Sequence, residues 1–248
     1  MLERMRKNFH EAKYATLGLE ILVVIVGILI AFQIDRWAET SRDREREHQY
    51  LIRLKADLIL ETGQMDDSLA YAESRLASVM LLTRIVIDPA AAAEQPDEVL
   101  NAIETVTWET FPQISAFVYG ELQSSGQLGL IRSPSLRRAL ASHYVFIDHE
   151  SRIGFDNDIE DLFVRRVTGI LTLAELLHIE ATDGDVKSDS TSAARAVEVA
   201  RVFAARADAV ALLPSLAQHH TYNSKVIAAG RERATLIIEE IDSLLEGQ

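Results

Sequence analysis

The sequence contains no cysteine among its 248 residues. Disulfide bonds, zinc sites with cysteine ligands and catalysis by a thiol are therefore excluded. Strand signals are nearly missing, and proline occurs only at five positions that coincide with apparent helix boundaries, namely 89, 96, 112, 134 and 214. The sequence therefore predicts an all-α fold whose helices begin or end near these prolines.

Positive charge is in deficit, because 25 Lys and Arg stand against 38 Asp and Glu, for a formal net charge of −13. Only four of the basic residues and three of the acidic ones precede residue 35, so the acidic excess belongs to the rest of the chain. Such a surface is a poor partner for nucleic acid or for anionic lipid head groups. Solubility explains the excess more simply than a cation-binding role.

The signatures of catalytic and cofactor sites are also missing. No glycine-rich phosphate loop or dinucleotide-binding fingerprint occurs, and Ser124 lies in no G-x-S-x-G motif. The acidic run 156–161 lacks the Gly and the Glu that a calcium loop needs at its sixth and twelfth positions. We therefore expect no enzyme activity, no cofactor and no bound metal.

Two pairs of histidines are candidate metal ligands. His143 and His149 are six residues apart, which places them about 120° apart around a helix rather than on one face. His219 and His220 are adjacent and point in different directions. The sequence therefore favours solvated or helix-capping roles for both pairs.

One long apolar run is present, from Leu17 to Ile34. Fourteen of its eighteen residues are large apolar residues or Ala, and 21–32 holds no polar residue. At about 1.5 Å per residue a helix of this length reaches roughly 27 Å, which is enough to cross a bilayer. A soluble amphipathic helix would interrupt such a run with a polar residue at every third or fourth position, which makes a buried core helix the less favoured reading. No small-x-small cleavage site follows, so an uncleaved signal anchor fits better than a cleaved signal peptide.

The charges that flank this predicted transmembrane helix nearly balance, with four Lys and Arg before it and five in the twenty residues after it. The short basic tail 1–16 and the long domain that follows favour a cytoplasmic N-terminus. We expect a single-pass protein of the inner (plasma) membrane with a periplasmic or extracellular C-terminal domain. Three basic residues are expected at the cytoplasmic interface and one aromatic residue at the other, namely Arg6, Lys7, Lys13 and Trp37.

The residues after the span predict a stalk and then a bundle. Segment 35–50 is expected to be a charged helical stalk, because 39–49 has no apolar residue and carries both signs of charge. Within 51–248, apolar residues first recur as in a coiled coil, at 51, 54, 58, 65, 69, 72, 76 and 79, with Thr62 in the one gap. Ser133-Pro134 predicts a helix start, followed by one or two long helices to about residue 179. We therefore expect 51–248 to form a bundle of long antiparallel helices.

Two segments resemble a known family. Gly18-Leu19-Glu20 and the apolar run up to Trp37 resemble the anchor of bacterial single-span membrane proteins grouped as domain of unknown function 6090, in which Gly-Glu precedes an Ile-Gly-Ile-Leu core and Ala-x-Gln-Ile-x-x-Trp. Segment 121–131, ELQSSGQLGLI, resembles a second signature of that family, a Ser-Gly turn between helices. The resemblance implies membrane anchoring and a helical domain, and it implies no activity.

One face of the predicted span carries its only acid together with small residues, and these are Glu20, Val24, Gly27, Ala31 and Ile34. We expect this face to pack against copies of the chain or against another membrane protein subunit. The sequence therefore favours a membrane-anchored interaction module that acts as a scaffold, sensor or accessory subunit. The alternative is a homo-oligomeric pore or ion-conducting unit built on the Glu20 helix.

Overall fold

The structure, a computed structural model, is helical in every described element, which confirms the all-α prediction. Its backbone is described for residues 2–108, 111–112, 114–154, 158–182, 184 and 191–247. Its side chains are described for 24–108, 111–112, 114–151, 159–182, 184 and 191–247. No strand occurs within these ranges.

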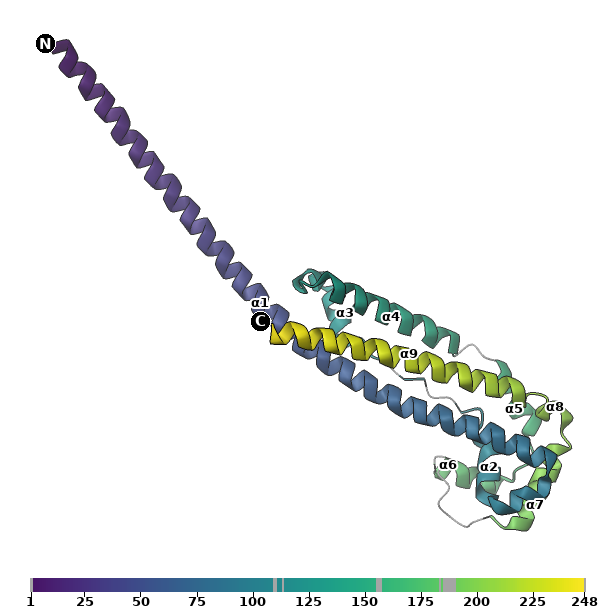
Figure 1. Ribbon diagram of the computed structural model, residues 1–248. Coiled ribbons are helices and arrows are strands. Elements are labelled where there is room, and N and C mark those ends of the chain that lie inside the picture. Colours follow the sequence, from purple (N-terminus) through teal and green to yellow (C-terminus); the bar gives the residue numbers. More distant parts are fainter. Residues whose placement is uncertain are drawn as a thin grey trace.

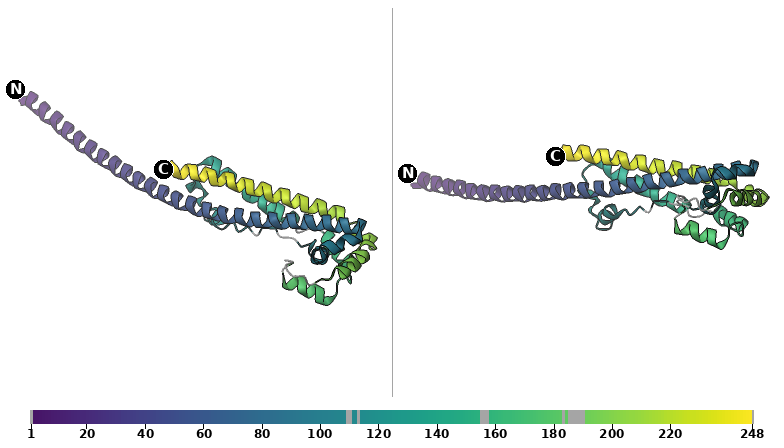
Figure 2. Two further views of the ribbon diagram at one scale, coloured as in Figure 1. Left: turned by 60° about the horizontal axis from the view of Figure 1, so that its bottom comes forward. Right: turned by 90° about the horizontal axis from the view of Figure 1, so that it is seen from below.

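Three long helices form the body of the molecule, α1 (Leu2–Ile87), α4 (Pro134–Gly154) and α9 (Leu213–Glu246). Helix α9 runs antiparallel to the other two, as Figures 1 and 2 show. Lys55 of α1 accordingly bonds Asp242 near the end of α9, and Ser135 at the start of α4 donates to Glu240. The N-terminal half of α1 extends alone beyond the bundle. The predicted antiparallel packing of long helices is thus confirmed for α9 against α1 and for α9 against α4.

The remaining described elements are short, and several of them gather at the end of the bundle that is farthest from the N-terminus (Figure 1). They are η1 (Pro89–Glu94), α2 (Pro96–Thr105), α3 (Phe117–Ser124), η2 (Gln127–Leu130), α5 (Asp158–Val167), α6 (Leu173–Ala181), α7 (Ala193–Ala204) and α8 (Ala207–Val210). The bundle therefore combines three long helices with a cap of short ones.

The apolar repeat of α1 faces three hydrophobic cores, the smallest of which holds Met65 with Ile147 and Ile227. Leu51, Leu54 and Leu58 lie in the first core, where they pack with apolar residues of α3, α4 and α9. Val79 lies in the second core, with the C-terminal end of α1 and the short helices α2, α5 and α7. Six of the eight predicted positions are buried, namely 51, 54, 58, 65, 72 and 79, and the other two are partly buried. The sequence pattern therefore identified the inward face of α1.

Short-range signals set most helix ends. Helix α1 stops before Asp88, whose side chain accepts from the backbone N–H of Ala90. The Ser133 hydroxyl accepts from the N–H of Leu136 and caps α4, which confirms the predicted helix start. Gly126 follows α3 with φ 69°, a left-handed conformation that favours glycine.

The segment between residues 134 and 179 has one more break than the sequence predicted. Three helices occur in it, because the chain turns again after α5. Gly169 has φ 83° at this turn, and the Thr172 side chain then caps α6 in a capping box with Glu175. These signals lie in a region whose apolar spacing by itself is compatible with a continuous helix.

Candidate functional site

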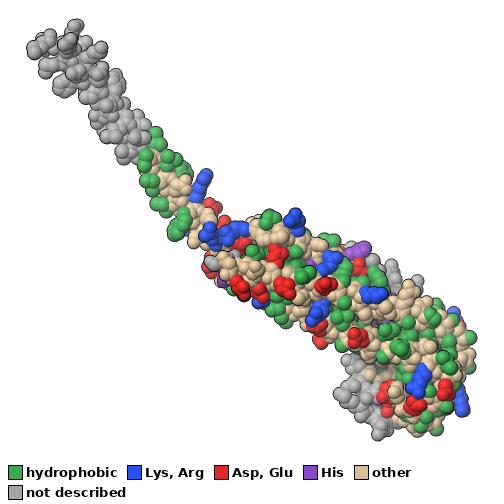
Figure 3. Space-filling model, viewed as in Figure 1, with side chains coloured by type: hydrophobic (Ala, Val, Ile, Leu, Met, Phe, Trp, Pro, Cys, Tyr) green, Lys and Arg blue, Asp and Glu red, His purple; other side chains and the backbone are tan. Residues whose placement is uncertain are grey.

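The free part of α1, residues 24–37, carries large apolar side chains that no other described element covers. Those from Val24 to Ile34 are 45 to 62% exposed, and Trp37 is 74% exposed. Figure 3 shows this apolar segment between the bundle and the undescribed side chains at the N-terminal end. Burying a large apolar side chain stabilises a fold by about 1.5 to 3 kcal/mol. The exposed side chains of residues 24–37 lack this stabilisation, whereas the core side chains of the bundle have it.

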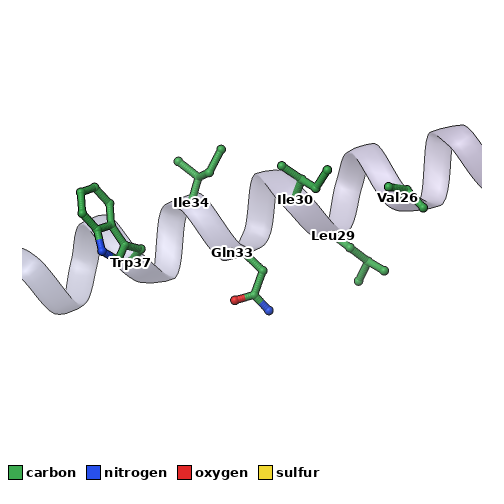
Figure 4. A pocket seen from close by; sticks show the side chains of 6 residues that line it. All are labelled: Val26, Leu29, Ile30, Gln33, Ile34 and Trp37. Carbon is green, nitrogen blue, oxygen red and sulfur yellow. The ribbon is translucent and has the colours of Figure 1, made fainter.

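A shallow groove of about 360 Å³ runs along this free helix. Its lining comes from one helix alone and consists of Val26, Leu29, Ile30, Gln33, Ile34 and Trp37. Figure 4 shows Ile30 and Ile34 directed to one side of the helix and Leu29 and Gln33 to the other. With one polar residue among six, the groove offers a surface for hydrocarbon rather than for a polar ligand.

The described side chains include only part of the predicted span. Among them, no helix holds an apolar stretch long enough to cross a membrane. Residues 17–23 of the span, which include Glu20, lie outside the described side chains. The predicted interface residues Arg6, Lys7 and Lys13 lie outside them as well.

The predicted packing face is bare where the structure describes it. Val24, Ala31 and Ile34 are exposed, and a Cβ placed on Gly27 would meet no atom within 4 Å. These residues therefore lie on one helix, and no other described element of the chain packs against them.

Within its described side chains, from residue 24 onward, α1 is first buried at Glu47, and the bundle begins there. The backbone N–H of Arg132 donates to Glu47 Oε1 over 2.6 Å, and Arg132 Nε donates to Oε2 over 2.5 Å. A polar groove of about 600 Å³ lies beside this pair, lined by Ser41, Arg44, Glu45, His48, Arg132 and Gly247. The buried carboxylate therefore fixes the η2–α4 turn to α1 at the level where the free helix enters the bundle.

A buried polar cluster links α1 to α4 in the first core. Glu61 Oε2 lies 3.1 Å from His143 Nε2, and Glu61 Oε1 accepts from the Tyr144 hydroxyl over 2.9 Å. The Tyr119 ring stacks on Tyr144 with the ring centroids 4.6 Å apart. Burial, and then the negative charge of Glu61, raise the pKa of Tyr144 far above its usual value, so its hydroxyl remains a donor.

Cavities lie on both sides of this cluster. One of about 170 Å³ opens between α4 and α9 and is lined by Ala139, Ser142, His143, Arg233, Leu236, Ile237 and Glu240. The other, of about 290 Å³, is lined by Pro112, Ile114, Ala116, Tyr144, Ile147, Asp148 and Ser151. Both oxygens of Glu61 already have partners within the cluster. The cluster therefore holds α4 on α1.

The part of the chain that the structure describes forms no cluster of metal ligands. No three His, Asp or Glu side chains there converge as metal ligands do. The hydroxyl of Ser142, next to His143, accepts from Arg233 Nη1 over 3.3 Å. The Ser142 hydroxyl therefore takes part in a hydrogen bond between α4 and α9.

Three assignments made from the sequence are wrong. His143 and His220 are buried rather than solvated or capping, with His143 on Glu61 and His220 Nε2 2.7 Å from the Val106 carbonyl oxygen. The gap in the α1 repeat is filled by the buried Glu61, whereas Thr62 is only partly buried. Position 61 and position 62 both lie three or four residues from Leu58 and from Met65, so the spacing alone does not tell which of them faces inward. Glu61 faces inward because His143 and Tyr144 of α4 bond its carboxylate.

Comparison with known proteins places the chain in a family. The family model described as a family of unknown function, DUF6090, matches residues 20–178, so the chain belongs to this family. The match confirms the family that segments 18–37 and 121–131 resemble. No curated protein and no solved structure matches the chain.

Proposed function

We propose that this member of DUF6090 is a membrane-anchored helical interaction module whose α1 crosses the inner membrane over residues 17–34. The supporting observation is the stretch from Val24 to Phe32, which has no polar side chain on any side of the helix and is exposed throughout. A helix that is apolar all round is stable in a protein core or in lipid. Because no described element covers this stretch, we infer that the hydrocarbon chains of lipids surround it.

The stalk then holds the bundle away from the bilayer. Helix α1 continues without a break from the span to Ile87, and Glu47 is the first buried residue among its described side chains. The thirteen residues from Ile34 to Glu47 correspond to about 20 Å at the helical rise. An acidic bundle at this distance avoids anionic head groups and presents its sides to other proteins. We place the short basic tail in the cytoplasm and the bundle in the periplasm or outside the cell.

The interior of the bundle favours an interaction module over an enzyme. Its buried carboxylates, Glu47 and Glu61, each use both oxygens to join α1 to other segments, and the buried Arg75 of α1 donates to the backbone carbonyl of Thr105 in α2. Such groups maintain the shape of a scaffold, sensor or accessory subunit. The bilayer and another protein subunit, or a second copy of the chain, are the partners that this function requires.

Membrane extraction tests the anchor. The full chain should remain in the membrane pellet after alkaline carbonate washing. Val26→Asp combined with Ile30→Asp places two carboxylates in the span at a cost of about 5 to 7 kcal/mol and should move most of the protein to the soluble fraction. Val145→Asp combined with Leu177→Asp, at two exposed positions of the bundle, is the matched control and should leave it in the pellet. A soluble wild type, or a span variant that stays in the pellet, would refute the anchor.

Protease accessibility tests the orientation. Protease added to intact spheroplasts should digest the bundle, whereas an internal control protein stays whole. A bundle that is protected until the inner membrane is broken would reverse the proposed orientation.

A further inference from the structure

The outer face of α1 in the bundle is apolar although it points away from the core. This outer face consists of Ile52, Ala56, Ile59, Leu60 and Gly63, all of which are exposed. The three large residues Ile52, Ile59 and Leu60 are 45, 49 and 68% exposed. An amphipathic helix on a core normally places polar residues on this side.

The charges beside the outer face are already engaged within the chain. Arg53 Nη2 lies 2.5 Å from Glu121 Oε2 of α3, and Lys55 Nζ lies 2.5 Å from Asp242 Oδ1 of α9. A partner that covers the outer face would therefore bury no unpaired charge at its centre. Asp66 and Asp67 follow the face and set its limit away from the membrane.

The spacing of the outer face is that of a coiled-coil seam. Residues 52, 56, 59 and 63 are separated by four, three and four positions, with Ile alternating with a small residue. A Cβ added to Gly63 would meet no atom within 4 Å, so the fold of one chain does not require glycine there. Glycine lowers the stability of a helix interior, and its use here fits the close approach of a second helix.

The outer face lies on the same side of α1 as the packing face predicted in the span. Gly63 follows Gly27 by 36 residues, which is about ten turns of one uninterrupted helix. Leu60 follows Val24 by the same interval. Helices that associate in the membrane through Gly27 would therefore direct their outer faces toward each other.

We propose that the outer face of α1 is a dimer interface whose partner is a second copy of this chain, packed in parallel about a two-fold axis. This inference rests on the proposed membrane anchor, because a shared bilayer orients two copies alike and sets them at equal height. Identical residues then meet across the axis, Ile with Ile and small with small, as an isologous contact requires. The face spans only about 17 Å, so the membrane supplies the high local concentration that a short seam needs.

Cysteine cross-linking of the full chain in its native membrane tests the interface, since the chain has no cysteine of its own. Ala56→Cys and Gly63→Cys should each give a disulfide-linked dimer as the main oxidised product. Gln64→Cys is the control, because it is exposed on the same helix about 100° from Gly63. It should give at least tenfold less dimer. Equal cross-linking at all three positions, none at 56 and 63, or a product with a different protein would overturn the proposal.

A second variant separates this interface from the anchor and from contacts made only in the span. Ile52→Asp with Ile59→Asp, added to Ala56→Cys, should reduce the dimer at least tenfold while the protein stays in the membrane pellet. Both side chains are exposed, so the fold of the single chain is retained. Undiminished cross-linking would contradict a seam on the outer face. Loss of the protein from the pellet would instead show that the anchor had failed.

Discussion

Residues 24–37 and residues 47–63 belong to the same helix and both contain several Ile and Leu residues, but their surroundings differ. The first segment is exposed on every side, whereas the second buries Leu51, Leu54 and Leu58 completely. No proline interrupts either segment, so one helix can run through both. Helical structure alone therefore does not reveal which half of α1 contributes to the stability of the bundle.

The largest expected effect separates the buried and exposed sides of the second segment. Leu58→Asp should lower the free energy of unfolding by about 3 to 5 kcal/mol, because it places an unpaired carboxylate in the first core. Gln64→Asp on the exposed side should cost less than about 0.5 kcal/mol. Thermal melting of the full chain in detergent, followed by circular dichroism, measures both. Equal effects would mean that Leu58 does not face a core.

The polar cluster of the second segment should give the next effect. Glu61→Ala removes the partner of both His143 and Tyr144, and leaving buried donors without an acceptor should cost about 2 to 3 kcal/mol. Glu73→Ala, at an exposed position on the same helix, should cost almost nothing. Denaturant unfolding compares the two variants. Similar midpoints would show that the cluster does not hold α4 on α1.

A smaller effect, dependent on pH, should arise at the far end of the bundle. Arg195 Nε and Nη2 donate to the Glu175 carboxylate, and these bonds lower the pKa of Glu175 to about 2. The depressed pKa means that the pair stabilises the native state fully above the ordinary value near 4.5 and loses this contribution as pH falls toward 2. The loss should be about 1 to 2 kcal/mol after allowance for solvent screening.

The control for this pH effect is Glu175→Gln, which cannot titrate. The difference in unfolding free energy between wild type and variant should be constant above pH 5 and shrink between pH 4.5 and 2. A difference that stays constant over that range would rule out a depressed pKa at Glu175.

The smallest effect on folding is expected in the first segment. Ile30→Asp should change the melting temperature of the bundle by less than about 1 °C, because no described side chain packs on Ile30. Melting in detergent at fixed protein concentration measures this. A clear destabilisation would show that the free segment contributes to the fold of the bundle.

Local and periodic signals were sufficient for much of the architecture. The repeat from Leu51 to Val79 identified the inward face of α1, and Ser133-Pro134 identified the start of α4. Both signals are spacings of three or four residues along the chain, so they can be recognised without knowing which helix packs against the segment. The extra break at Gly169 was missed because its apolar neighbours keep a helical spacing across the turn.

Buried polar residues were not predictable in the same way. His143 and Glu61 are 82 positions apart, and nothing near either residue in the sequence indicates the other. His220 likewise bonds the Val106 carbonyl oxygen from a distant helix. A polar side chain is retained in a core only when a partner from another segment satisfies it, so its burial depends on the tertiary structure.

By itself, the sequence determined that the chain is helical, that one long apolar run precedes an acidic helical domain, and which side of α1 faces inward, because these features follow from composition and from the helical period. The tertiary structure alone decided which charges are buried and which apolar side chains remain uncovered. Glu61 is enclosed because α4 brings His143 and Tyr144 to it, and Ile59 is exposed because α3 and α9 contact α1 on either side of it.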